Sequence, residues 1–182
     1  MIYFFRACWG CKDMMYLFVE GPDDERFFSK VFGERWSNLT FVRYAKLPSN
    51  KINNFIKSIS CTPSSDYIFI GDADGKAIEQ KTQELITKYK YLEETKVAIV
   101  QYEIESWYYA GVNELLRKKI GMKRYIFYTD QLTKEEFDSM LPKKMDRKYV
   151  LTLVLSSYDL EIAVERNHSL CIFNKNIRKE LA

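Results

Sequence analysis

Short, largely apolar runs alternate with helix-like segments over the first hundred residues, and this alternation constrains the fold more than any other feature. The apolar runs are residues 15–19, 39–44, 67–70 and 96–102. The segments between them that place apolar side chains at helical spacing are residues 24–32, 50–60 and 77–92. Because strands that alternate with helices pair in parallel through right-handed crossovers, we expect an α/β fold. The sheet should have four strands, mainly parallel, flanked by helices.

From Glu105 onward the pattern is helical. The helix-like segments of this part are residues 105–121, 133–141, 147–167 and 169–181. No internal repeat, low-complexity segment or Gly/Ser-rich linker separates it from the rest. A chain of 182 residues suffices for one domain with a helical appendage. We therefore expect a loose N-terminal segment at 1–14, an α/β core at 15–111 and a helical extension at 112–182 that packs on the core.

The sequence suggests a cytoplasmic protein. No apolar run approaches the ~18 residues of a membrane span, and the first residues lack the pattern of a signal peptide. The four cysteines should then be reduced. Cys8 and Cys11 form a Cys-x-x-Cys pair, but Cys61 and Cys171 are isolated, so a zinc site lacks its second pair. We interpret the pair as part of the loose N-terminal segment; translation that starts at Met14 or Met15 is a related hypothesis.

Carboxylates follow three of the four predicted strands. Glu20 follows the first strand with Asp24 four residues later, and the fourth is followed by Glu103 and Glu105. The third strand is followed by Asp72 and Asp74, in the sequence GDADG. The carboxyl ends of parallel strands share one edge of the sheet, where α/β proteins bind ligands. Each acid alone could cap a helix, form a turn or lie in solvent, but together they should repel one another unless a cation is present.

The spacing and chemistry of these acids favour a hard metal ion. Asp72 and Asp74 are two residues apart and would point the same way in an extended chain. Gly71 and Gly75 flank them and permit a sharp turn. Oxygen donors without histidine or cysteine suit Mg²⁺ or Mn²⁺. The proposed ligands are Glu20, Asp24, Asp72 and Asp74.

These motifs resemble those of the Toprim domain, which primases, topoisomerases, recombination proteins and small nucleases share. The residues that carry the resemblance are the Glu-Gly in VEGPDDERFF after the first strand and the Asp-x-Asp in IFIGDADG after the third. It covers about residues 16–110. The short chain, the IESW segment and the helical tail are most similar to stand-alone proteins related to the overcoming-lysogenization-defect nucleases, some of which act in phage defence. The C-terminal helices match no pattern of the family.

The resemblance implies a Rossmann-like, Toprim-type sheet and a metal-dependent nuclease. It assigns Glu20 as a metal ligand or general acid/base, Asp24 as the second acid of the nuclease branch, and Asp72 with Asp74 as metal ligands. Glu105 is a further acid that the resemblance adds as a fifth metal ligand. The catalytic residues would be Glu20, Asp72 and Asp74. No nucleotide-binding P-loop motif is present, so an ATPase that works with this chain would be a separate partner protein.

Basic residues gather in two runs of the C-terminal half, although the net charge is only +3. Such runs often lie in solvent, but clustered lysine and arginine also mark nucleic-acid surfaces. The candidates for phosphate contact are Lys76, Arg117, Lys118, Lys119, Lys123, Arg124, Lys143 and Lys144. The sequence thus predicts a nuclease that hydrolyses DNA or RNA. Two alternatives stay open: a non-catalytic module that binds nucleic acid or a partner, and an enzyme of nucleotidyl or phosphoryl transfer on a small nucleotide.

Overall fold

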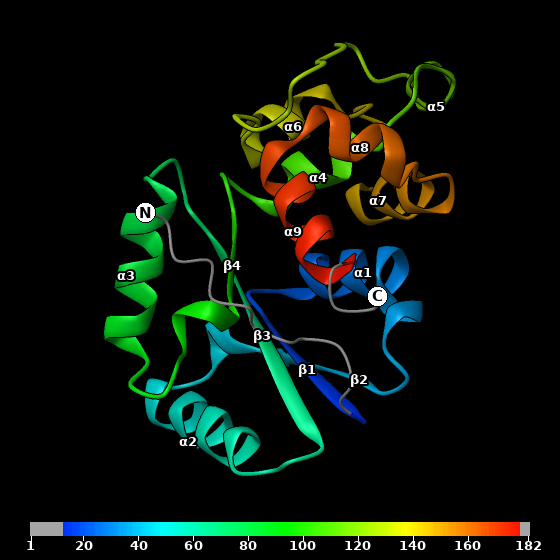
Figure 1. The fold of residues 1–182 in the computed structure, drawn as a ribbon. Coiled ribbons are helices and arrows are strands. Elements are labelled where there is room, and N and C mark those ends of the chain that lie inside the picture. Colours follow the sequence, from blue (N-terminus) through cyan, green and yellow to red (C-terminus); the bar gives the residue numbers. More distant parts are fainter. Residues whose placement is uncertain (1–12, 179–182) are drawn as a thin grey trace.

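A four-stranded parallel sheet forms the centre of the protein (Figure 1). The computed structural model describes residues 13–178. The strands are β1 (Met14–Val19), β2 (Leu39–Arg43), β3 (Ser65–Asp72) and β4 (Val97–Val100), in the order β2-β1-β3-β4. Every pairing is parallel. The expected α/β fold is thus confirmed, with a Rossmann-like sheet that is parallel throughout.

Helices cover both faces of the sheet because the side chains of each strand alternate between two cores. Leu17 and Ile70 belong to the core on one face, and Phe18 and Phe69 to the core on the other. The connecting helices are α1 (Pro22–Val31), α2 (Ser49–Ser60) and α3 (Ile78–Lys88), with short 3₁₀ helices η1 (Gly33–Arg35), η2 (Tyr44–Lys46) and η3 (Glu94–Lys96). Helix α1 packs on the first face, and α2 with α3 packs on the second.

The C-terminal helices share the first of these cores. They are α4 (Ile104–Ala110), α5 (Glu114–Ile120), α6 (Lys134–Met140), α7 (Arg147–Ser156), α8 (Leu160–Arg166) and α9 (His168–Arg178). Trp107 of α4, Val154 of α7 and Phe173 of α9 are buried in the cluster that contains Phe27 and Phe28 of α1. In Figure 1 most of these helices lie beyond the end of the sheet at which β1 and β3 finish. They therefore stand over the edge where the acids were predicted.

Two of the predicted C-terminal helices are each broken into two. The expected helix at 105–121 ends at Ala110, and α5 restarts with Asn113 as its cap, whose side chain accepts the Leu116 N–H at 2.8 Å. At the break, a Cβ atom on Gly111 would lie 2.3 Å from the Tyr158 ring. The expected helix at 147–167 breaks in the same way, and Asp159 caps the new helix α8. Both breaks are explained by side-chain caps, and the first also by the tight packing contact. The spacing of apolar residues does not reveal either feature.

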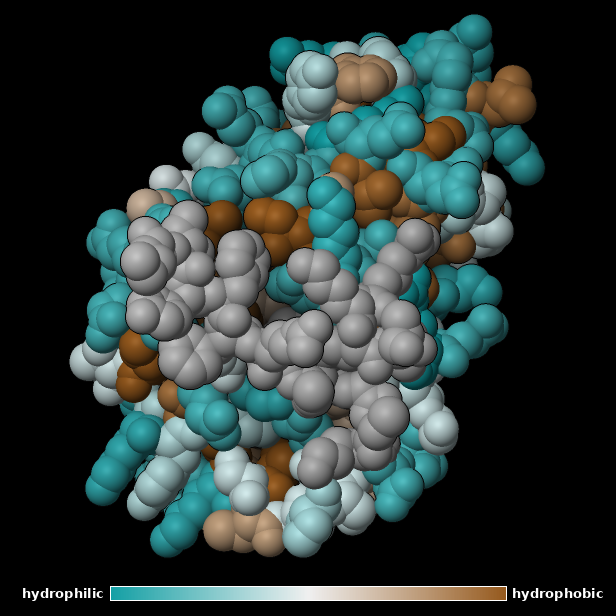
Figure 2. Space-filling view, in the orientation of Figure 1, coloured by the Kyte–Doolittle hydropathy of each residue, from teal (hydrophilic) through white to brown (hydrophobic). Residues whose placement is uncertain are grey.

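Further expectations concern the start of the first strand, the N-terminal cysteines and membrane-spanning helices. β1 begins at Met14, one residue before the predicted strand. Cys8 and Cys11 lie outside the described residues. Among the helices of residues 13–178, none combines the length and apolar character needed to span a membrane. On the side shown in Figure 2, the C-terminal helices carry mostly hydrophilic residues, with hydrophobic ones in small separate groups.

Candidate functional site

The carboxyl ends of β1 and β3 lie at the point where the chain changes direction across the sheet. These neighbouring strands lead into helices on opposite faces, because α1 follows β1 and α3 follows β3. Such a switch point opens a crevice that in parallel α/β sheets is the usual ligand site. Glu20 follows β1 directly and is exposed, and Asp72 is the last residue of β3. Two of the predicted acids therefore lie at this switch point.

Asp72 is a buried carboxylate without compensation. Its side chain lies on the sheet face that α1 covers, two residues after Ile70. It is only 9 % exposed, and within residues 13–178 its Oδ1 atom has no hydrogen-bond partner. Burial raises the pKa of Asp72 well above its ordinary value. The nearby negative charges add to that rise in the order Asp24, Glu20, Glu105 and Asp74.

Asp24 is the second buried acid of the crevice. It lies in the first turn of α1 and its Oδ2 atom accepts the Gly21 N–H at 3.0 Å, so it also caps the helix. Burial raises its pKa to about 7 although backbone hydrogen bonds oppose the shift. Glu20 and Glu105 raise it further by repulsion. Capping alone therefore does not account for its environment, which is both apolar and negatively charged.

The turn after β3 holds Asp74 at the outer edge of the crevice. Asp74 and Gly75 both have left-handed backbone conformations, with φ of 54° and 79°. This pair of residues bends the chain away from the sheet, and glycine adopts such a conformation without strain. The exposed Asp74 carboxylate forms an ion pair with Lys81 at 2.8 Å. Lys76, predicted to contact phosphate, instead binds both carboxylate oxygens of Glu84.

Arg147 at the start of α7 is the residue of this site that the sequence analysis missed. Its guanidinium binds the carboxylates of Asp23 and Glu105, and its Nε donates to Asp138 at 2.8 Å. It therefore joins α1, α4 and α6 at the crevice. Arg147 stands in the run KKMDRK, where apolar spacing and charge count do not reveal which basic side chain turns inward.

The pKa shifts around Arg147 follow from this arrangement. Burial raises the pKa of Asp23, but hydrogen bonds from Arg147 and Arg26 outweigh it and the net shift is downward. Burial also raises the pKa of Glu105, and there it prevails over the attraction of Arg147. Only 3 % of Glu105 is exposed. Of the acids at the crevice, Asp23 and Glu105 thus have a cation within the chain, whereas Asp72 and Asp24 face mainly other acids.

The donor set fits a hard divalent cation that keeps much of its own hydration. In residues 13–178 no three histidine, cysteine, aspartate or glutamate side chains are grouped so as to hold an ion together. Mg²⁺ commonly binds through one or two carboxylates and completes its shell with water and phosphate oxygens. Asp72, with its unpartnered oxygen, and Asp24 beside it provide such a pair. Glu20, four residues before Asp24, is an exposed acid directly after β1.

The structure brings the two predicted basic runs together. The Lys123 N–H donates to the Met140 carbonyl at 3.4 Å, so the end of the first run lies beside the turn that carries the second. Arg117 and Lys118 form ion pairs with Glu114. Within the described chain, no ion pair engages the exposed residues Lys119, Lys123, Arg124, Lys143 and Lys144. Lys144 precedes Arg147, which binds Asp23 and Glu105, by three residues.

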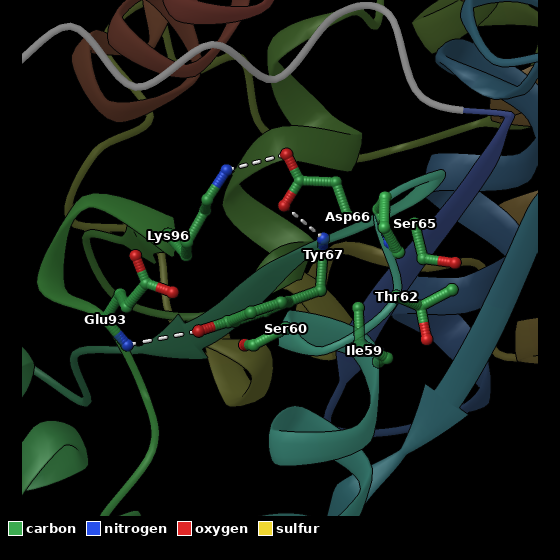
Figure 3. A pocket seen from close by; sticks show the side chains of 9 residues that line it. Ile59, Ser60, Thr62, Ser65, Asp66, Tyr67, Glu93 and Lys96 are labelled. Atoms are coloured by element: carbon green, nitrogen blue, oxygen red, sulfur yellow. Dashed lines mark hydrogen bonds and ion pairs between the residues drawn. The ribbon is translucent and has the colours of Figure 1, made fainter.

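The opposite end of the sheet has a polar hollow of about 370 Å³ (Figure 3). Asp66 and Lys96 line it and form an ion pair at 2.7 Å. Asp66 also accepts the Tyr67 N–H at 2.7 Å, and the Tyr67 hydroxyl accepts the Glu93 N–H at 3.1 Å. The charges of Asp66 and Lys96 satisfy each other, so this hollow lacks the uncompensated groups found at the carboxyl end.

Comparisons of the chain with known protein families, with curated proteins and with solved structures found no match.

Proposed function

We propose that the chain is a Toprim-type, metal-dependent nuclease that hydrolyses phosphodiester bonds in DNA or RNA. The observation that supports it most is the buried, uncompensated Asp72 carboxylate, which faces Asp24 and Glu20 at the switch point of the sheet. A cation at this place would relieve the repulsion among these acids. The Glu-Gly and Asp-x-Asp motifs, which resemble those of the Toprim family, point to the same chemistry.

Asp72 and Asp24 would bind the ion directly. Glu20, and Asp74 after release from Lys81, would reach it only after their side chains move, because no three acids of residues 13–178 are grouped around one point. A bound Mg²⁺ or Mn²⁺ would polarise the phosphate and lower the pKa of a bound water. The chain itself supplies the surroundings. Arg147 binds Asp23 of α1 and Glu105 of α4 and so links these two packed helices beside the acids. The exposed lysines of the two basic runs would hold the nucleic-acid backbone without reading its sequence.

A cleavage assay tests this function. Labelled single- and double-stranded DNA and RNA are incubated with the protein and Mg²⁺, Mn²⁺ or EDTA. We expect metal-dependent cleavage that Asp72→Asn and Asp24→Asn each lower by at least about 100-fold, since each removes a ligand. Glu94→Gln is the matched control, because it removes one negative charge at the other end of the sheet, where Glu94 is exposed. Cleavage that persists unchanged in Asp72→Asn, or no cleavage by the wild type, would rule out the nuclease.

The second candidate is a nucleic-acid-binding module without catalytic activity. Two of the five predicted metal ligands are paired with cations of the chain, Asp74 with Lys81 and Glu105 with Arg147. If these ion pairs persist when nucleic acid binds, the remaining acids would hold an ion that is structural. A metal that raises the melting temperature of the wild type but not of Asp72→Asn, in a protein that cleaves no substrate, would identify this case.

A further inference from the structure

The segment between α5 and α6 exposes three aromatic rings within four residues. Of Tyr125, Phe127 and Tyr128, the exposed fractions are 44 %, 48 % and 75 %. Single exposed apolar side chains are ordinary on a protein surface, but a group of large rings usually marks a binding site. We call residues 123–128 the aromatic loop. It has no part in the acid site.

The backbone of the aromatic loop is anchored to the helices beneath it. The Tyr109 hydroxyl donates to the Arg124 carbonyl at 2.6 Å and accepts the Ile126 N–H at 3.2 Å. Just past the loop, the Thr129 N–H donates to the Arg166 carbonyl at 3.0 Å. Ile126 turns inward and packs against the large core. The rings are thus presented by a fixed scaffold, and binding a partner would cost little ordering entropy.

The rings are also held relative to one another. The Arg166 guanidinium lies 5.2 Å from the centre of the Tyr125 ring and 5.5 Å from that of Phe127. It also donates to the Tyr125 hydroxyl at 2.7 Å. Phe127 meets Tyr128 edge to face, with ring centres 4.9 Å apart. Tyr128 is the most exposed of the three rings.

Several cations lie in the aromatic loop or near it. Lys123 and Arg124 lie in the loop itself and are exposed. The contact between Lys123 and Met140 brings the lysines of the turn between α6 and α7 close to the loop. Rings interleaved with cations complement a strand whose bases are free to stack and whose phosphates are negative. Bases in a duplex are already stacked on each other, so a duplex would offer this surface only its phosphates.

We propose that the aromatic loop binds single-stranded nucleic acid, with bases stacked on Tyr128 and its neighbouring rings and phosphates on the adjacent lysines and arginine. The inference rests on the proposed function in that it names the substrate class of the same nuclease. The second basic run begins close to the loop and contains Arg147, so it would lead a single strand toward Asp72.

Binding in EDTA tests the loop apart from any cleavage. Fluorescence anisotropy with a labelled thymidine 20-mer and with a duplex of equal length compares the wild type with Tyr128→Ala. We expect the variant to bind the single strand about tenfold more weakly, because base–aromatic stacking contributes that order of affinity. Duplex binding should change less than twofold. Circular dichroism and thermal unfolding would confirm that the variant folds, as the exposure of Tyr128 leads us to expect.

Two further variants sharpen the test. Tyr128→Trp keeps a stacking face, so it should retain wild-type affinity, and its added fluorescence should be quenched by the single strand. Tyr91→Ala is the matched control, because Tyr91 is exposed and has Lys57 and Lys90 over its ring, each 5.6 Å from the centre, outside the aromatic loop. It should bind both oligonucleotides as the wild type does.

The outcomes separate the loop from the acid site. If Tyr128→Ala and Phe127→Ala bind the single strand as tightly as the wild type, the inference is overturned even when the wild type cleaves. The loop would then be a surface for another kind of partner, such as a protein. If Tyr128→Ala loses single-strand binding while no metal supports cleavage, the inference stands and the nuclease fails.

Discussion

Strand β3 carries a buried aspartate near each end, and the two differ in how their charge is met. Asp66 is 7 % exposed and Asp72 is 9 % exposed. Asp66 has Lys96 at 2.7 Å and a backbone N–H, as Figure 3 shows. Asp72 has an oxygen without a partner in the described chain and is surrounded by acids. Two equally buried carboxylates on one strand thus have opposite electrostatic surroundings.

This difference separates an acid with a structural role from one without it. A buried charge is costly unless it is paired and hydrogen-bonded. The surroundings of Asp66 meet that requirement within the chain, so its role is structural. The surroundings of Asp72 do not, and neither helix capping nor an ion pair explains its position. An external cation is the simplest group that would supply what Lys96 supplies at the other end.

The largest loss of stability should come from breaking the ion pair between Asp66 and Lys96. In Lys96→Met, Asp66 keeps its burial but loses its cation, so the free energy of unfolding should fall by about 4 kcal/mol. Asp66→Asn should also destabilise, since it leaves Lys96 unpaired. The double variant should lose less than the sum of the two, because neither charge remains.

Urea unfolding at pH 7.5 measures these differences. Lys51→Met provides the control, since Lys51 is exposed on α2 and its loss should change the stability by less than about 0.5 kcal/mol. Equal stability of Lys96→Met and the wild type would mean that Lys96 does not stabilise the buried Asp66. The contrast between Asp66 and Asp72 would then be wrong.

The next effect should come from Asp24 and should depend on pH. Its pKa is about 7 in the folded protein against 3.8 for the free side chain. Because the folded-state pKa is raised, the protonated acid carries no stability penalty below about pH 4, and the penalty grows as the pH rises to 7. Asp24→Asn removes this term while its amide oxygen can still accept the Gly21 N–H. The free energy of unfolding of the variant, relative to that of the wild type, should therefore rise by on the order of 3 kcal/mol between pH 4 and pH 8.

Urea unfolding in EDTA across this pH range measures that gain. Glu94→Gln is a suitable control, since Glu94 is an exposed acid at the other end of the sheet. Its stability relative to the wild type should not rise with pH over the same interval. A constant difference between Asp24→Asn and the wild type would show that Asp24 is ionised in the fold throughout.

Much of the fold was predictable because it depends on local pattern. Uninterrupted apolar runs gave the strands, and alternation with helices gave their parallel order. The breaks at Gly111 and near Asp159 were not predictable from apolar spacing, since one depends on the distant Tyr158 ring and the other on a cap. The sharing of one core by α1 and the C-terminal helices is likewise a long-range property.

The acids that lie near one another could be predicted from the sequence, but the cations that pair with some of them could not. Topology alone places the ends of β1 and β3 together, so Glu20, Asp24 and Asp72 could be grouped from the sequence. The cations that meet Glu105 and Asp74 come from α7 and α3, and a basic residue in a charged run gives no sign of turning inward. The exposed rings of the aromatic loop were also missed, because an aromatic cluster is more often part of a core.

The smallest expected change in stability is that of Asp72→Asn. Its sign should be opposite to that of Asp66→Asn at the other end of β3. Asp72→Asn replaces an unpartnered, repelled carboxylate by a neutral amide that can donate to the acids beside it. In EDTA at pH 8 we expect the variant to be more stable than the wild type by about 2 kcal/mol, whereas Asp66→Asn is less stable. Adding Mg²⁺ or Mn²⁺ should then raise the melting temperature of the wild type and of Glu94→Gln, but not of Asp72→Asn, since only binding to the folded state stabilises. If Asp72→Asn is destabilised as Asp66→Asn is, its carboxylate has a structural partner and the two ends of the strand are alike.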